Sequence, residues 1–514
     1  MANKFLVPVL VWLVISWAGF AFADESSPAT SQEEAIKGLP PHDEKYRDKV
    51  KAQEQREAER RKKIQEAIEK DQSILRPKRS PLDFSNNAIT LGEPYLGGGE
   101  IKDYGLTWLG DEANAVRPRA QLYGTLSSIL FGGRLSGRDL GQLGYNLDLD
   151  FNFDLTNTER FHVQYKPFVD RDTTKVGGLY RFHEHPDDPS TADHRFELSA
   201  DNTFAWFEGE IGEMFDFISP KDRVPTDYHI ALGLLPVLYQ NNYLMNDNVL
   251  GGLLSKPNIT VLGATNIVLQ GMFGFEDINA STAGGDGDSN QNNTNLYGLT
   301  ARVEYPKQFW ELNYFHMEDK VQTAETQDWA AVSLSSTYGL LNYAIRALFN
   351  FNDDRTGGGA PGDGQLYVFE MNHPVLIEDY YDNNYVYFNW FYGTDGWNDI
   401  AGGRAGRAGI AFRGNGVTSF AVMRNTGVGS IGGALGLKAF YLREELSINP
   451  EFAWLFDNHD SVGGSPVTND QFAFALEVQY LLSNHLSVVS KLVGIHNETR
   501  EEDYGSSLEM RFKF

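Results

Sequence analysis

The sequence of 514 residues contains no cysteine, has few basic residues and lacks repeated long apolar runs. The absence of cysteine excludes disulfides, thiolate metal sites, a cysteine nucleophile and covalently attached haem. Only 44 lysines and arginines stand against 70 acidic residues, and the formal charge of −26 excludes nucleic acid, which needs a basic partner surface. A bundle of transmembrane helices would need repeated runs of roughly 20 apolar residues. Strands that alternate polar and apolar residues remain compatible with this composition.

The N-terminus has the pattern of an export signal, which we assign to residues 1–23. Lys4 provides the positive start, residues 5–15 are mostly apolar, and Ala21-Phe22-Ala23 provides small residues for cleavage before Asp24. The apolar stretch is short for a membrane anchor. The sequence therefore predicts an exported protein.

A charged segment at 24–81 follows the signal. Residues 42–70 lack glycine and proline and are rich in Ala, Glu, Lys, Arg and Gln, which predicts a short, solvated periplasmic helix that ends before Pro77 and Pro81. Charges occupy the seam that a coiled coil would need, so a spacer is a better interpretation than a trimerisation helix. We expect residues 82–118 to form a periplasmic or lumenal lead-in.

From residue 119 to the C-terminus the dominant pattern has period two. In 143–155 every odd position is apolar and every even position is Gly, Asn or Asp. This run is closer to a tilted membrane strand of roughly 9–11 residues than to an ordinary strand of about 5–6. Similar apolar rows recur at 297–305, 341–351, 446–456 and 472–480. We expect 119–514 to form an all-β domain, an antiparallel transmembrane β-barrel of about 18 strands, with about 16 to 22 allowed.

The connections alternate between long polar loops and tight turns, as in outer-membrane barrels. Near the C-terminus, the loops 497–503 and 457–470 alternate with the turn 483–485. Further back, the turn Gly414-Asn415-Gly416 lies between the loops 394–403 and 425–429, which predicts a hairpin there.

The last strand carries the clearest resemblance to a known class. Residues 508–514 have apolar side chains at every second position and end on Phe514. In this the chain resembles bacterial outer-membrane barrel proteins, whose terminal aromatic residue is recognised by the outer-membrane assembly machinery. The segments 232–239 and 246–252 are similar to a strand and loop of porin-like and alginate-export barrels. The resemblance implies a Gram-negative-type outer membrane, with its lipid as a partner.

The candidate site residues are polar side chains that would face the lumen if the apolar rows face lipid. They are Asn146, Asp148, Asp150, Asn152 and Asp154 on one strand, and Arg302, Glu304, Glu477, Gln479, Glu509, Arg511 and Lys513 on others. These residues can equally serve only to solvate the wall and pair with one another. Metal sites are disfavoured, because the calcium-loop-like stretch from Asp286 has Gln291 and Tyr297 where Gly and Glu are required. His183 and His185 are followed by Pro186 and Pro189, which indicate a loop rather than a metal site. We expect no cofactor, no metal and no catalytic residues.

The sequence thus predicts an outer-membrane channel of the porin type for passive diffusion of small hydrophilic solutes, with a preference for cations. Two alternatives remain at this stage: an export conduit for a polysaccharide or other polymer, and a barrel enzyme. The solute, the pore radius and the choice between a monomer and a homotrimer are not determined by the sequence.

Overall fold

The computed structural model describes residues 89–90, 118–156, 158–168, 178–183, 194–196, 198, 203–214, 227–276, 278, 294–319, 326–352, 363–375, 384–402, 405–442, 444–457 and 470–514. Its strands are β1 Ile89–Thr90, β2 Arg119–Leu135, β3 Arg138–Asp154, β4 Arg160–Tyr165, β5 Gly178–His183, β6 His194–Phe196, β7 Thr203–Glu210, β8 His229–Tyr239, β9 Met245–Ile259, β10 Asn266–Glu276, β11 Thr294–Tyr305, β12 Gln308–Asp319, β13 Thr326–Tyr338, β14 Leu341–Asn352, β15 Gly364–Pro374, β16 Tyr385–Gly393, β17 Ser430–Tyr441, β18 Leu446–Asp457, β19 Gln471–Leu481, β20 Leu486–Asn497 and β21 Asp503–Lys513. The short helices are α4 Ile211–Met214, η3 Gln240–Asn242 and η4 Ala405–Arg407.

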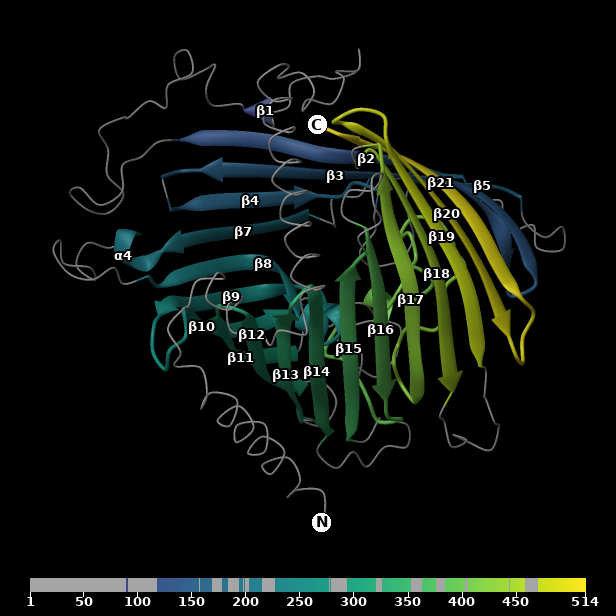
Figure 1. The fold of residues 1–514 in the computed structure, drawn as a ribbon. Coiled ribbons are helices and arrows are strands. Elements are labelled where there is room, and N and C mark those ends of the chain that lie inside the picture. Colours follow the sequence, from purple (N-terminus) through teal and green to yellow (C-terminus); the bar gives the residue numbers. More distant parts are fainter. Residues whose placement is uncertain are drawn as a thin grey trace, which may run out of the picture. The chain divides into compact units, whose positions relative to one another are not determined.

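These strands form one antiparallel sheet that closes on itself (Figure 1). Closure is made by β21 against β2, from Thr125 opposite Lys513 to Arg134 opposite Tyr504. β4 and β5 pair with successive parts of β3, while β7 pairs with β4 and β6 with β5. β4 and β5 therefore count as one barrel strand, and β6 and β7 count as the next. With them the barrel has 18 strands.

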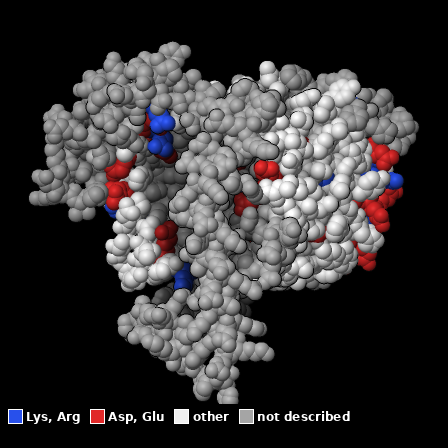
Figure 2. Space-filling model, turned by 45° about the horizontal axis from the view of Figure 1, so that its top comes forward, with Lys and Arg blue, Asp and Glu red and all other residues white. Residues whose placement is uncertain are grey.

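The period-two pattern sorts side chains between the two faces of the wall. On β2, Ile129 and Phe131 are buried inside the barrel, whereas Leu126 and Leu130 on the other face are exposed. A sheet in lipid must satisfy all its backbone groups internally, and a closed antiparallel barrel does so. Figure 2 shows a broad uncharged outer surface, with charged side chains gathered at its edge and in the hollow beside it.

The connections give the barrel two different ends. At one end, which we call the turn end, tight turns follow β11 and β13, and Phe514 closes the sheet beside Gly124. At the other end, the loop end, β16 and β17 are joined by a long connection whose described residues are 394–402 and 405–429. Outer-membrane barrels have short turns on the periplasmic side and longer loops outside, so the turn end faces the periplasm. Among the described residues, no helix is long and apolar enough to cross a membrane.

The predicted fold class and strand number are confirmed, and one predicted element is wrong. The turn Gly414-Asn415-Gly416 does not join two barrel strands, because the described residues 394–402 and 405–429 contain no strand between β16 and β17. The signal peptide, the charged helix and most of 82–118 lie outside the described residues. Within the lead-in, Ile89, Thr90 and Pro118 are described, and Ile89 and Thr90 pair with Leu122 and Gln121 of β2.

Candidate pore constriction

The tip of the β8–β9 hairpin leaves the barrel wall. β8 and β9 stay paired up to Tyr239 and Met245, whereas the pairing of β9 with β10 stops at Leu250. The turn η3 consists of three consecutive residues with positive φ, a glutamine and two asparagines. Asparagine tolerates this left-handed backbone better than most residues, which allows a reversal this tight. The Gln240 side chain reaches Asn313 on β12, so the tip lies inside the lumen.

Glu370 on β15 holds this tip in place. Its Oε1 accepts hydrogen bonds from Asn241 Nδ2 at 2.9 Å and from the Tyr243 hydroxyl at 3.2 Å. Its Oε2 pairs with Arg346 Nε at 3.0 Å. Burial, and after it the Glu370 carboxylate, raises the pKa of Tyr243 well above its usual range, so the hydroxyl remains a donor. The hairpin tip is thus tied to the wall by a charged group with three partners.

A second segment, with residues 394–402 and 405–429 described, also folds into the lumen and is joined to the tip. Ile400 N donates to Leu244 O at 3.0 Å, and Asn246 N donates to Ala401 O at 2.9 Å. Around this junction the inner wall and the two segments form an apolar core, which includes Leu244, Met245, Trp329, Trp397, Ile400 and Phe412. The lumen is therefore narrowed by a packed core.

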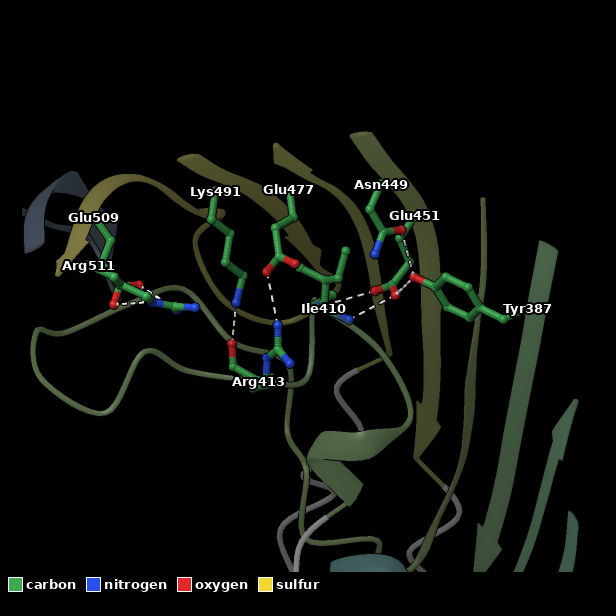
Figure 3. Close-up of polar contacts among 10 residues, drawn as sticks. Tyr387, Ile410, Arg413, Asn449, Glu451, Glu477, Lys491, Glu509 and Arg511 are labelled. Atoms are coloured by element: carbon green, nitrogen blue, oxygen red, sulfur yellow. Dashed lines mark hydrogen bonds and ion pairs between the residues drawn. The ribbon is translucent and has the colours of Figure 1, made fainter. Parts of the chain in front are cut away.

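Glu451 on β18 anchors the second segment (Figure 3). Its two carboxylate oxygens accept hydrogen bonds from the backbone N–H groups of Ile410 at 2.8 Å and Ala411 at 2.9 Å. The Tyr387 hydroxyl donates to Oε2 at 2.5 Å. Only 1% of the Glu451 surface is exposed, so these protein groups replace water as its hydrogen-bond partners. Each hydrogen bond to a charged group contributes about 1.5–3 kcal/mol, so the anchor fixes this part of the segment.

Paired charges line the wall beside the anchored segment (Figure 3). Arg413 Nη2 of the segment pairs with Glu477 Oε2 on β19 at 2.9 Å. The Lys491 ammonium on β20 donates to the Arg413 carbonyl oxygen, and Arg511 pairs with Glu509 at 2.6 Å on β21. Cationic and anionic groups thus alternate across β19 to β21. This side of the lumen has fixed charges of both signs.

The predicted residues of β3 lie on the inner face of the wall, where β2 separates β3 from β21. Gln142, on the same face, exchanges hydrogen bonds with Ser419 of the inward segment, which fixes the direction of this face. Three contacts are with neighbouring strands: Gln164 Nε2 donates to Asp150 at 3.0 Å, Asn152 Nδ2 donates to the Tyr123 hydroxyl at 3.2 Å, and Arg160 pairs with Asp154 at 3.3 Å. Within β3, Asn146 Nδ2 donates to Asp148 at 3.0 Å.

The other predicted residues are distributed around the barrel. Arg302 and Glu304 are on β11. Arg302 lies opposite Glu311 of β12, and Glu304 Oε2 accepts a hydrogen bond from Asn266 of β10 at 3.5 Å. Glu477, Glu509 and Arg511 belong to the charged group of Figure 3. Gln479 and Lys513 lie near the turn end, opposite Val489 and Thr125. The structure thus brings Glu477, Glu509 and Arg511 together near the constriction. It also places Arg511 and Lys513 across β2 from Asn146 and Asp148.

Sequence reasoning missed most residues that hold the constriction. Three of them, Arg346, Glu370 and Glu451, are polar residues in strands that alternate polar and apolar side chains. The rule that polar side chains of such strands face the lumen could have identified them. Arg413 and Tyr243 lie outside the strands, and no periodic signal marks them. Their roles depend on contacts between segments far apart in the sequence.

The closed 18-stranded barrel with inward-folded segments is the fold of a bacterial outer-membrane porin. Among solved structures, the chain is similar to a BenF-like porin from Pseudomonas fluorescens Pf-5, with a TM-score of 0.51, 12% identity and coverage of 77% of this chain and 98% of that one. It is also similar to OccK2 (OpdF) of Pseudomonas aeruginosa in complex with glucuronate, with a TM-score of 0.50, 11% identity and coverage of 77% and 98%. No protein-family model and no curated protein matches the chain. At these identities the likeness concerns the fold.

Proposed function

We propose that the protein is an outer-membrane channel for the passive diffusion of small hydrophilic solutes, without catalysis. The observation that carries this proposal is a polar cavity of about 740 Å³ at the turn end. Asn241 of the hairpin tip and Glu370 line it on the side of the constriction, and Pro306 and Lys307 of the β11–β12 turn line it at the turn end. This open, polar space lies between the narrow part of the lumen and the turn end of the barrel.

The inward segments argue against the alternative of a polymer conduit. A polysaccharide chain needs a continuous wide path, whereas the core around Leu244 and Phe412 occupies part of the lumen. The fold similarity to porins supports a channel rather than a barrel enzyme. We keep the small-solute channel as the proposal.

The proposal includes the partners expected from the sequence. Outer-membrane lipid surrounds the apolar outer face, and the terminal strand ending at Phe514 is the segment offered to the assembly machinery. A preference for cations is part of the same proposal, because the β3 wall is acidic. A homotrimer remains a proposal.

Planar-bilayer recording of the purified, full-length mature protein tests the proposed function. We expect stepwise, ohmic single-channel currents, and proteoliposomes that swell in small sugars faster than in larger ones. Protein unfolded by boiling serves as the control, since a barrel should show heat-dependent gel migration. A folded, membrane-inserted protein without conductance would refute the channel.

A further inference from the structure

The turn-end cavity has the chemistry of a binding site, and we infer that it takes uncharged polyhydroxylated solutes, that is, neutral sugars. This inference rests on the channel function proposed above and specifies its solute. The volume of about 740 Å³ is within the range of small-molecule sites and accommodates one or two sugar rings. The argument depends on three features of the lining: its neutral hydrogen-bonding groups, an aromatic ring and its charge.

Neutral side chains that both donate and accept hydrogen bonds dominate the lining. Thr337 Oγ1 donates to Asn342 Oδ1 at 2.7 Å, and Asn342 Nδ2 donates to Asn372 Oδ1 at 3.1 Å. Asn342 and Asn372 lie directly opposite each other on β14 and β15, and both are exposed to the cavity. An amide offers two donors and an acceptor with two lone pairs. This row can therefore exchange hydrogen bonds with neighbouring hydroxyl groups, each of which also donates and accepts.

The Tyr387 ring lies next to this row and forms a flat surface. Tyr387 on β16 is directly opposite Asn372, and its hydroxyl reaches past β17 to Asn449 at 3.1 Å and Glu451 at 2.5 Å on β18. This path crosses Gly436, where any Cβ would collide with the ring. The missing side chain thus lets one face of the ring rest on the β17 backbone. Tyr387 also lines the cavity, where its ring can meet the apolar C–H face of a sugar beside amides that bind the sugar hydroxyls.

The charge of the lining disfavours acids of the same shape. Two carboxylates, those of Glu304 and Glu370, line the cavity together with one lysine, Lys307. No arginine is among the described residues that line it, so a carboxylate solute would lack the planar fork that binds it best. Like charges brought together without compensation cost several kcal/mol. Arg346 already pairs with Glu370, which leaves this carboxylate little demand for a cationic ligand.

The test uses current block of the full-length protein in planar bilayers, with maltose, D-glucuronate and D-glucosamine as probes. We expect maltose to reduce the open-channel current saturably, at concentrations at least about tenfold below those of either charged sugar, a difference of about 1.4 kcal/mol. Stronger block by glucuronate or glucosamine than by maltose would overturn the inference. Absence of any conductance would instead refute the channel itself, so the two failures are distinguishable.

Variants locate the site. Tyr387→Leu should raise the half-blocking concentration of maltose about tenfold, and Asn372→Ala should raise it about threefold, following 1.4 kcal/mol per tenfold. Tyr387→Phe keeps the ring but loses the bond to Glu451, so it should retain block within about twofold. Tyr392→Leu is the matched control, because Tyr392 lies on the same strand and faces outward. Unchanged block in Tyr387→Leu, with heat-dependent gel migration preserved, would show that the ring is not part of a sugar site.

Discussion

At the scale of single residues, the closing seam depends on a close contact at Gly124. The last residue, Phe514, exchanges backbone hydrogen bonds with Gly124 at 2.9 and 3.1 Å. A Cβ at Gly124 would lie 2.6 Å from Asp148 O and 2.9 Å from Phe514 Cζ. Such distances require the backbone or the ring to shift. The terminal aromatic residue therefore has a structural role at the seam, separate from its proposed recognition by the assembly machinery.

Gly124→Val should impair closure although Phe514 is intact. We expect the fraction of heat-modifiable, membrane-inserted protein to fall severalfold, because overpacking costs about 1–3 kcal/mol where backbone cannot move. Gly132→Val is the matched control on the same strand, since no atom lies within 4 Å of a Cβ there. Gel mobility before and after heating measures the outcome. Equal assembly of the two variants would contradict a steric requirement at the seam.

Phe514→Ala separates the two roles of the terminus. Removing the ring keeps the backbone pairing of β21 with β2, so barrels that form should remain closed. If the ring is the assembly signal, the variant should insert poorly in cells yet refold normally in detergent. Equal loss in cells and in detergent would assign the ring to the seam alone.

At the scale of elements, the constriction is a segment held by its anchors, and Glu451 is the strongest of them. Glu451→Gln keeps one carbonyl oxygen but replaces the other acceptor by an amide donor that faces a backbone N–H. We expect residues 405–413 to loosen, with larger and more variable single-channel conductance and faster proteolysis in this stretch. Barrel stability should change little, because the sheet is unaltered. Glu501→Gln, at an exposed rim pair with Arg134, is the control. Conductance equal to that of the parent would show that the anchor does not set the opening.

The same element shows which parts of the fold could be predicted from sequence. The alternation in 143–155 specified β3 and its inner face, because lipid and water sort side chains at a fixed period of two. Residues 405–424 also contain a turn-like Gly414-Asn415-Gly416 between apolar positions, which predicts a hairpin. In the structure the segment is instead held by Glu451, Gln142 and the β8–β9 tip. Only contacts distant in sequence distinguish an inward-folded segment from a barrel hairpin. The strands of the wall could therefore be predicted from the sequence, whereas the constriction could not.

At the scale of the whole molecule, acidic residues exceed basic ones, but their positions determine how they act on a passing ion. Opposite charges alternate near the constriction, where Arg413 faces Glu477 and Arg511 faces Glu509. These pairs leave little net field of either sign. The acidic residues of β3 lie across β2 from the Arg511–Glu509 pair, and Asp148 and Asp150 have neutral hydrogen-bond partners, so ion selectivity should arise mainly on this wall.

The open channel should therefore favour cations over anions, modestly and in a salt-dependent way. Asp148 and Asp150 accept hydrogen bonds from the neutral amides of Asn146 and Gln164, whereas Asp154 pairs with Arg160. Lys166 lies close enough to Asp148 to attract its carboxylate, which reduces but does not reverse the field. Acidic walls of low dielectric constant concentrate counter-ions. The screening length falls from about 30 Å at 0.01 M to about 3 Å at 1 M, so the preference should fade as salt rises.

Reversal potentials in a salt gradient measure this preference. Replacing Asp148 and Asp150 together by asparagine should move the reversal potential toward anions, because two carboxylates with neutral hydrogen-bond partners are lost. Asp154→Asn should move it less, since Arg160 already offsets that charge and retains Glu208 at 3.4 Å. The double variant removes two carboxylates and Asp154→Asn removes one. Comparing the shift per removed carboxylate therefore separates the effect of local pairing from that of total charge. An anion-selective parent channel would contradict the prediction, and an equal shift per carboxylate in both variants would show that pairing on this wall does not govern selectivity.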